Sequence, residues 1–326
     1  GLAPGLAVDE AFIRHQLSLR RPQGKISTSR VEADEFQIVS GVFEGHTTGA
    51  PLTILFRNEN VKSQDYAQFA AMPRPGHADL TAAHRWDDCN DPRGGGHFSG
   101  RLTLPVVAAG VVAKKILADA TILDETPVPY NGICAQIVEL GGIPAPSAEL
   151  SECHVEGSET SMGEAIDQAA AEGDSLGAVI ECVVPEIDPG YGEPFWDSVE
   201  SQIAHAIFSI PGVRGVEFGD GFKAAAMRGS EHNDPIGEDG RPAKNGAGGV
   251  NGGLTNGAHL KFRVAFKPVA TLLMEQHTVD KDGNDTTLKA KGRHDPCVLP
   301  RAVPIVEAMA AMTILDYYLT DKTTRL

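Results

Sequence analysis

The sequence predicts an α+β fold built as one domain over residues 1–326. Segments typical of strands and of helices are mixed along the chain, without the strict strand–helix alternation of a parallel α/β sheet. No run rich in Pro, Ser or charge divides the chain as a linker would. The sequence also lacks the GxGxxG fingerprint and the Walker lysine loop, so neither a Rossmann nor a P-loop nucleotide site is supported.

The spacing of apolar residues along the chain predicts the individual helices and strands. Asp9 can cap a helix that carries Ile13 and Leu17 on one face and is ended by Pro22. The alanine-rich segment 102–118 is apolar on both faces, which is typical of a buried helix. Further helices are expected over 162–171, 199–207 and 302–319. Strands are expected over 36–43, 51–56, 133–140, 176–184, 213–218 and 259–266.

Composition restricts the classes of partner. The net charge of −16 argues against nucleic acid and anionic membranes as partners. No apolar run reaches about 18 residues, so we expect no membrane span. The five cysteines are scattered and form no CxxC pair, which favours free thiols in a reducing cytosol and a cytoplasmic location.

The stretch 74–103 is the strongest candidate for a site. It holds four arginines, three histidines and four aspartates around three successive glycines, Gly94, Gly95 and Gly96. Such glycines let the backbone approach a ligand closely, and arginines bind phosphate or carboxylate bidentately. A histidine nearby can move a proton near neutral pH. Because a buried helix follows, its positive end is directed back at this loop.

Four separate motifs, in order along the chain, resemble those of chorismate synthase. They are RPGHAD with RGGGHFSGR, RGSEHNDPIG, GGLTNGAHLKFRVAFKP and GRHDPCVLPRAVP, and the resemblance runs from residue 1 to about residue 317. It implies a single-domain β-α-β sandwich in which antiparallel sheets enclose helices. It further implies an enzyme that removes phosphate and a ring proton from 5-enolpyruvylshikimate 3-phosphate to give chorismate, the last common step of the shikimate pathway. The family needs reduced FMN, although the reaction has no net redox change.

The same resemblance implies roles for particular residues. His77, which lies between Arg74 and Asp79 in the sequence, and Asp295 would be catalytic. The substrate would be bound by Arg20, Lys25, Arg74, Arg101 and Arg293. The flavin would be bound by His97, Phe98, Ser99, Gly252, Lys267, Pro268, Val269, Ala270, Thr271 and Arg293. The implied assembly is a homotetramer without a metal, and a separate reductase would regenerate FMN from NAD(P)H.

The sequence departs from the family pattern at two places. Most members carry Arg-Ser-Ser after the triple glycine, whereas this chain has His97-Phe98-Ser99, so we expect flavin binding through different contacts. The family's Gly-x-Ser-His-Gly motif is not in this sequence. We therefore expect this polypeptide to bind FMN weakly and to turn over substrate at least ~10²-fold more slowly than one that carries that motif.

One further segment and two alternatives complete the predictions. Residues 228–257 contain nine glycines, and we expect this segment to form a mobile wall over the active site.

A metal-dependent phosphohydrolase would use oxygen and nitrogen ligands from His77, Asp79, His84, Asp87, Asp88 and Asp91, although their spacing matches no specific metal motif. A non-catalytic oligomeric scaffold would instead use the apolar helices as an interface.

Overall fold

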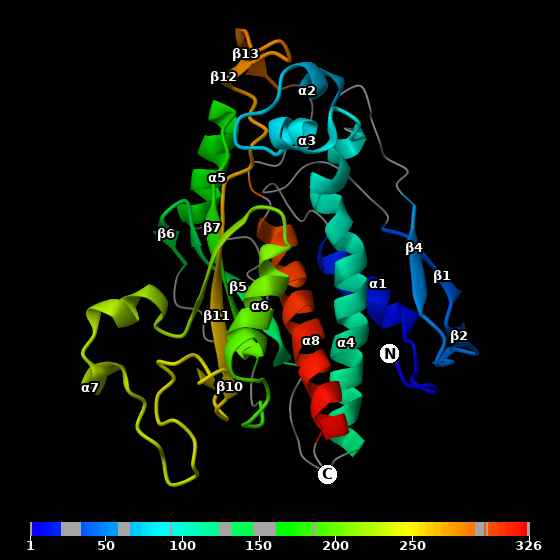
Figure 1. Cartoon of the computed structure of the whole chain (residues 1–326), viewed down its shortest axis with the longest axis vertical. Coiled ribbons are helices and arrows are strands. Elements are labelled where there is room, and N and C mark those ends of the chain that lie inside the picture. The colour runs from blue at the N-terminus through cyan, green and yellow to red at the C-terminus, as the bar shows by residue number, and fades with distance from the viewer. Residues whose placement is uncertain are drawn as a thin grey trace.

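Two long helices lie side by side in the centre of the molecule. They are α4 (Thr103–Leu123) and α8 (Leu299–Thr324), seen in the computed structural model of Figure 1. A Cβ atom placed on Gly110 of α4 would lie 2.2 Å from the Cβ of Ala308 in α8. The small residue at each position is therefore what allows the two backbones to pack this closely.

The structure describes residues 2–20, 34–57, 66–91, 93–123, 132–145, 161–184, 187–290, 297 and 299–324. Three residues with predicted roles, Lys25, Arg293 and Asp295, lie outside the described residues.

A five-stranded antiparallel sheet covers one side of the helices, in the strand order β6-β5-β7-β11-β8. Its strands are β5 (Cys134–Leu140), β6 (Ile143–Pro144), β7 (Ala178–Val184), β8 (Val213–Phe218) and β11 (Leu260–Phe266). Every second residue of β11 is buried, beginning with Leu260 and Phe262. This alternation is what a strand with one face on a core requires.

The other side of the helices is covered by a two-stranded antiparallel sheet, β1 (Phe36–Ser40) and β4 (Thr53–Phe56) (Figure 1). Strand β4 contacts α4, whereas α8 contacts β5 and β7 of the larger sheet. The helices therefore lie between antiparallel sheets, and the predicted α+β sandwich is confirmed.

Further helices complete the central layer. α1 (Glu10–Leu19) packs on α4, and α6 (Val199–Phe208) packs on α8 and β8. A helix outside this layer, α5 (Ser161–Glu172), lies beside β7 in Figure 1 and contributes Met162 and Ile166 to the core. Asp9 caps α1 as predicted, because its Oδ1 accepts a hydrogen bond from the N–H of Phe12 at 2.9 Å.

The predicted strand 36–43 is divided into two pieces. β1 ends at Ser40, and Val42–Phe43 (β2) pairs with His46–Thr47 (β3). Gly41 between them has φ +85°, and a Cβ there would lie 2.6 Å from the Cα of Leu52. Only glycine tolerates this bend, which is why the extended pattern stops at that position.

The upper end of the molecule in Figure 1 carries elements that the sequence patterns did not predict. They are α2 (Ala67–Ala71), α3 (Asp79–Trp86), β12 (Glu275–Val279) and β13 (Asp285–Lys289). Phe69 and Leu288 form a small separate core there, and Thr278 Oγ1 donates to the carbonyl of Pro73 at 2.5 Å. The β12–β13 hairpin is thereby fixed against the segment that leads into α3.

The glycine-rich segment 228–257 has a different place from the predicted one. It includes α7 (Gly229–His232), β9 (Val250–Asn251) and β10 (Leu254–Thr255), and it lies at the lower left of Figure 1, away from α3. Asp234 organises it by accepting hydrogen bonds from the N–H groups of Gly246 and Ala247 at 3.0 and 3.1 Å. Within one chain this segment does not cover the 74–103 stretch.

Two expectations from composition also need revision. By length and composition, 301–324 of α8 could cross a membrane, but 61% of its apolar window is buried inside the protein, as in a core helix. The carboxylate of Glu307 is buried there as well and accepts hydrogen bonds from Lys114 Nζ at 2.6 Å and from Ala135 N at 2.9 Å.

Cys89, Cys182 and Cys297 are free thiols, whereas Cys134 is disulfide-bonded, so the expectation of free thiols throughout is wrong.

Candidate functional site

Arg74 is the centre of a buried polar cluster in front of α3. Its Nε donates to Asp79 Oδ2 at 2.7 Å and its Nη2 to Asp79 Oδ1 at 2.8 Å. Its Nη1 donates to Thr271 Oγ1 at 3.0 Å, and its Cζ lies 4.2 Å from the ring centroid of Phe69. Only 7% of Arg74 is exposed. The guanidinium is therefore committed to protein partners, which argues against its predicted role as a ligand of substrate phosphate.

Asp79 is an ionised carboxylate in this cluster. Burial by itself raises its pKa, but hydrogen bonds and charge interactions with Arg74 and His77 hold the pKa well below its ordinary value. Its position in the first turn of α3 adds the favourable end of the helix dipole. Asp79 is therefore a fixed negative charge on which the neighbouring histidine can be oriented.

His77 is held by this carboxylate at one ring nitrogen. Its Nδ1 lies 2.6 Å from Asp79 Oδ1, and Arg74 Nη2 lies 3.0 Å from Nδ1 and 3.2 Å from Nε2. Because a carboxylate at this distance accepts a hydrogen bond, Nδ1 is assigned the proton, and Nε2, which lies beside the guanidinium of Arg74, is the nitrogen left to exchange one. The side chain is 18% exposed, so a ligand can reach it.

Aromatic rings extend from His77 to the residues after the triple glycine. The ring of Phe98 meets His77 edge-on at 6.2 Å between centroids, and Trp86 of α3 lies 6.1 Å from Phe98 and 6.2 Å from His97. The fold thus brings Phe98 against the predicted catalytic histidine, and Trp86 connects Phe98 with His97; both Phe98 and His97 are predicted to bind flavin. This is an apolar wall of the kind on which a planar ring system can pack.

The triple glycine folds into a 3₁₀ turn, η3 (Arg93–Phe98), rather than an open loop. Gly96 has φ +55°, and a Cβ there would lie 2.5 Å from the carbonyl oxygen of Asp91. A second 3₁₀ turn, η4 (Gly100–Leu102), follows and runs into α4, with the Ser99 hydroxyl accepting from the N–H of Arg101 at 3.3 Å. The compact turns fix Ser99 and Arg101 at the N-terminal end of α4.

Arg20 reaches this turn from the other end of the sequence. It lies at the C-terminus of α1, is 5% exposed, and its Nη2 donates to the carbonyl of Gly100 at 3.3 Å. The carbonyl of Gly100 also accepts from Thr103 Oγ1 at 2.5 Å. The structure therefore brings Arg20 against the turn that carries Arg101.

The turn after β11 closes the site from a third direction. Thr271 contacts Arg74, as described, and a Cβ on Gly76 would lie 3.9 Å from the Cβ of Ala270. The carbonyl of Val269 accepts a hydrogen bond from Ser175 Oγ at 2.8 Å. The predicted flavin-binding turn 267–271 and the predicted catalytic stretch thus meet, although they are far apart in the sequence.

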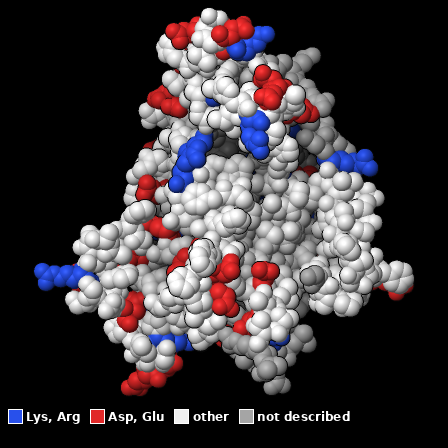
Figure 2. Space-filling view, in the orientation of Figure 1, with Lys and Arg blue, Asp and Glu red and all other residues white. Residues whose placement is uncertain are grey.

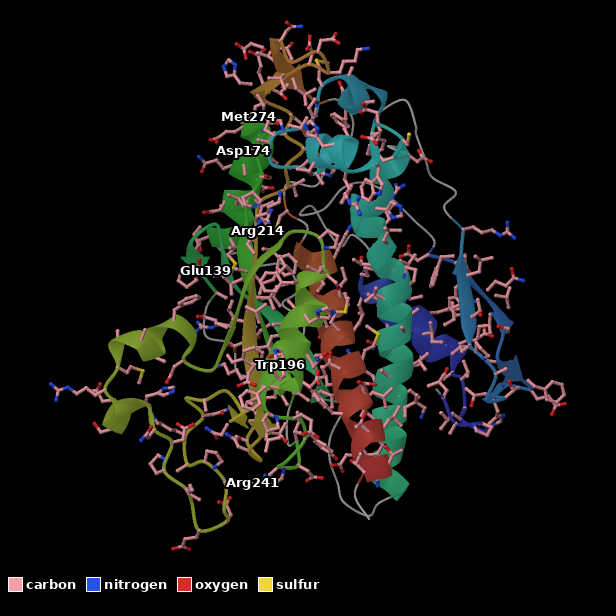
Figure 3. The ribbon with its side chains drawn as sticks, viewed as in Figure 1. Glu139, Asp174, Trp196, Arg214, Arg241 and Met274 are labelled. Carbon is pink, nitrogen blue, oxygen red and sulfur yellow. The ribbon has the colours of Figure 1, made fainter. Side chains whose placement is uncertain are left out.

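Lys267 is the first residue of this turn, and its surroundings disfavour its charged form. Burial lowers its pKa, and the positive charge of Arg214 lowers it further. Figure 2 shows a hollow below α2 and α3 with basic side chains on both sides, and Arg214, labelled in Figure 3, lies at the margin of this hollow. Cations beside a hollow on a protein of net charge −16 indicate a site for an anion.

One predicted site residue is not brought to this place within the chain. Gly252 lies in the tight turn between β9 and β10, with φ +62°, and this hairpin is at the opposite end of the molecule from α3 (Figure 1). The length of β11, roughly 20 Å for its seven residues, separates the two ends.

The sequence reasoning missed two residues of the site. Asp79 was noted only as a neighbour of His77 and as a candidate metal ligand, and Arg214 was not noted at all. The spacing in RPGHAD was a usable signal for Asp79, because it places a carboxylate two residues after the histidine. No local signal marks Arg214, since its proximity to Lys267 arises from strand pairing.

Two other features do not compete with this site. An apolar cavity of about 380 Å³ is lined by residues of β4, α4 and α8, including Phe56, Ala109 and Met312, and contains no predicted site residue. Among the described residues, no three His, Cys, Asp or Glu side chains lie close enough together to hold a metal ion. The phosphohydrolase alternative therefore gains no support from the described part of the chain.

Comparison with known proteins identifies the family. The chorismate synthase family model matches residues 1–319. A chorismate synthase of Chitinophaga pinensis is 46% identical over 99% of this chain and 90% of its own length, and one of Korarchaeum cryptofilum is 45% identical over 97% and 90%.

A crystal structure of chorismate synthase superposes with a TM-score of 0.67 at 26% identity, covering 98% of this chain and 86% of the other. Sequence motifs, fold and relatives all agree, and nothing favours a phosphohydrolase or a scaffold. The chain belongs to the chorismate synthase family, and it is a carbon–oxygen lyase of aromatic biosynthesis.

Proposed function

We propose that the hollow between α3, η4 and the 267–271 turn binds 5-enolpyruvylshikimate 3-phosphate together with reduced FMN. The observation that carries this proposal is the hydrogen bond from Arg74 to Thr271, which joins two stretches 197 residues apart. Each stretch was assigned to the site independently by its own motif. Their meeting supports a shared site for His77, the aromatic wall and the turn that begins at Lys267.

The substrate phosphate is assigned to Arg101, with Arg293 from outside the described residues; Arg20, predicted as a further ligand, is as buried as Arg74 and supports the turn that carries Arg101. Arg101 lies on η4, where the positive end of α4 adds to its charge. Arg20 is buried against the same turn and fixes its backbone. Arg74 is reassigned: its hydrogen-bonding groups hold Asp79 and Thr271, so it is a positioning residue. Lys25 stays a proposed substrate ligand.

His77 moves the proton in this scheme. With Nδ1 hydrogen-bonded to Asp79, its Nε2 can donate a proton as the carbon–oxygen bond to phosphate breaks. A protonated leaving phosphate carries less charge, which lowers the barrier to its departure. Asp295 assists the loss of the ring proton, which completes the elimination and leaves the new carbon–carbon double bond.

The described residues fit a flavin. Phe98 with Trp86 and His97 provides an apolar wall for a planar ring, and Lys267 provides a cation for a phosphate. His97, Phe98, Ser99, the turn 267–271 and Arg293 would hold it, whereas Gly252 would have to come from a second copy of the chain. Reduced FMN, when bound, supplies electron density that promotes loss of the phosphate and a base for the ring proton.

The proposal also covers the location of the protein, its oligomeric state and its supply of reduced FMN. The chain acts as one domain in the cytoplasm, assembles as a homotetramer and receives FMN reduced by a separate NAD(P)H-dependent reductase. The apolar helices and the distant position of Gly252 support an oligomer, because a partner could bring that hairpin to the site. Light scattering at micromolar concentration should give four chains, and a monomer would contradict this part of the proposal.

Ligand-dependent thermal stability tests the proposed function. We expect FMN and 5-enolpyruvylshikimate 3-phosphate together to raise the unfolding temperature more than either does alone, because each contributes a surface for the other. A ligand at 100 times its Kd stabilises the folded state by about 2.7 kcal/mol. Inorganic phosphate at the same concentration is the control. No shift with either ligand or with both would contradict the proposal.

A further inference from the structure

Phe69 lies against the face of the Arg74 guanidinium. The Cζ atom of Arg74 is over the ring, 4.2 Å from its centroid, and Phe69 and Arg74 are only 4% and 7% exposed. A cation over an aromatic ring is attracted by the negative face of its π-system, and the attraction is strongest where water is excluded. Because both side chains are buried, solvent screens this contact little.

The hydrogen bonds of Arg74 use the edge of the guanidinium. Nε and Nη2 donate to the two carboxylate oxygens of Asp79, and Nη1 donates to Thr271 Oγ1. These donors lie in the guanidinium plane, so the bonds are well aligned only while the plane keeps its tilt. The ring of Phe69 restrains that tilt because it contacts the face. A change in tilt would weaken the bonds to Asp79, on which the orientation of His77 depends.

The ring of Phe69 is itself held in place by the upper end of the molecule in Figure 1. Phe69 belongs to α2, packs with Leu288 of the β12–β13 hairpin in the small separate core, and meets Tyr66 edge-on at 6.1 Å between centroids. The hairpin also holds the end of α2, because the N–H of Lys281 donates to the carbonyl of Ala71 at 3.0 Å. The ring is therefore a preorganised surface against which the guanidinium rests.

Two other cations lie over aromatic rings in the described ranges, and both differ from this pair. Arg14 Cζ lies 4.6 Å from the centroid of Phe36, but the side chain of Arg14 is 46% exposed. Lys322 Nζ lies 5.3 Å from the centroid of Tyr318, and Lys322 is exposed as well. Because water weakens such a contact, the pair of Arg14 with Phe36 is a matched comparison for the buried pair.

We propose that Phe69 is a positioning residue for the reaction, because it holds the Arg74 guanidinium at the tilt at which Asp79 orients His77. The inference rests on the proposed function, which gives the proton transfer to His77. Phe69 acts through Arg74 and exchanges no proton itself. Since the proton moves in the transition state, Phe69 contributes to kcat and leaves the affinity for substrate nearly unchanged.

The test varies the electron density of the ring at nearly constant shape. Phe69 is replaced by phenylalanines that carry one, two or three ring fluorines, since each fluorine weakens the attraction of the ring face for a cation. The same series at Phe36 is the matched control, because that ring also lies under a guanidinium. Phe69→Leu removes the ring but keeps an apolar side chain. Urea unfolding establishes that the variants are folded.

The values of kcat and KM for chorismate formation are measured with photoreduced FMN, in the wild-type chain and in His77→Ala. We expect kcat to fall with each fluorine on Phe69, by about 10-fold for three fluorines and for Phe69→Leu, while KM changes by less than about 2-fold. The series at Phe36 should leave kcat unchanged. In His77→Ala the series at Phe69 should have little effect, because the group that Phe69 positions is gone.

A flat series at Phe69, equal falls at Phe69 and Phe36, or a rise in KM with unchanged kcat would overturn the inference. A fall at Phe69 that persists in full in His77→Ala would also overturn it, because Phe69 would then not act through His77. Failure of the proposed function looks different. Near-normal turnover of His77→Ala with Phe69 intact would remove the proton transfer from His77, and this inference with it.

Discussion

Asp79 and His77 form a short contact, with 2.6 Å between Oδ1 of the carboxylate and Nδ1 of the imidazole. The carboxylate is fixed in turn by two hydrogen bonds from the guanidinium of Arg74. The orientation of His77 therefore depends on a buried ion pair that is anchored through Thr271 to the 267–271 turn, the proposed flavin-binding turn. This chain of contacts links the fold to the proposed proton transfer.

Removal of the His77 imidazole should slow the reaction without disturbing the fold. We expect His77→Ala to reduce kcat by about 10²-fold, the usual scale for loss of a general acid. His46→Ala is the control, because His46 is exposed on β3 and its ring contacts the carbonyl of Glu44. Chorismate formation with photoreduced FMN is the readout. Near-normal turnover in His77→Ala would remove this residue from the mechanism.

Asp79 should make stability depend on pH in the acid range. Its pKa is lower in the folded state than its ordinary value of 3.8, so its contribution is complete above that value and is lost as the pH falls below it. We expect Asp79→Asn to be less stable than wild type at pH 7. The difference should shrink as the pH is lowered from about 5 to about 2. Urea unfolding at several pH values measures it, and a constant difference would show that Asp79 is not the titrating group.

The close contact of α4 and α8 should be sensitive to a single methyl group. A Cβ at position 110 would lie 2.4 Å from the Cα of Ala308, which is backbone and cannot move aside. We expect Gly110→Ala to lower the free energy of unfolding by at least about 1–3 kcal/mol. Gly229→Ala is the matched control, since a Cβ there meets nothing within 4 Å. Equal stabilities of the two variants would contradict the packing described for the central helices.

The sequence predicted the helices and the inner strands of the large sheet because their apolar periodicity is local. The predicted 102–118 helix is observed as Thr103–Leu123, and Val199, Ile203 and Ile207 form the buried face of α6 as predicted. The β12–β13 hairpin was missed because its strands are polar and mostly exposed, so they lack the alternation that marks a half-buried strand. The end of β1 depends on the approach of Leu52 to Gly41, which is a tertiary contact.

The site was predictable to the extent that its residues lie in one stretch. His77, His97, Phe98 and Ser99 were assigned from motifs; Phe98 contacts His77, and Arg74 of the same stretch contacts Thr271 of the 267–271 turn. The commitment of Arg74 to protein partners was not predictable, because a free and a buried guanidinium look the same in a sequence. Arg214 and Lys267 come close together because β8 pairs with β11, and local sequence patterns do not reveal this pairing.

The central claim is that Asp79 acts on the reaction through His77, and a double-mutant cycle tests it most directly. The value of kcat for chorismate formation is measured with photoreduced FMN for wild type, His77→Ala, Asp79→Asn and the double variant. We expect Asp79→Asn to lower kcat by about 10-fold or more in the wild-type chain and by less than about 2-fold when His77 is already alanine. Equal fold reductions in both backgrounds would show that Asp79 acts independently of His77, and would contradict the account.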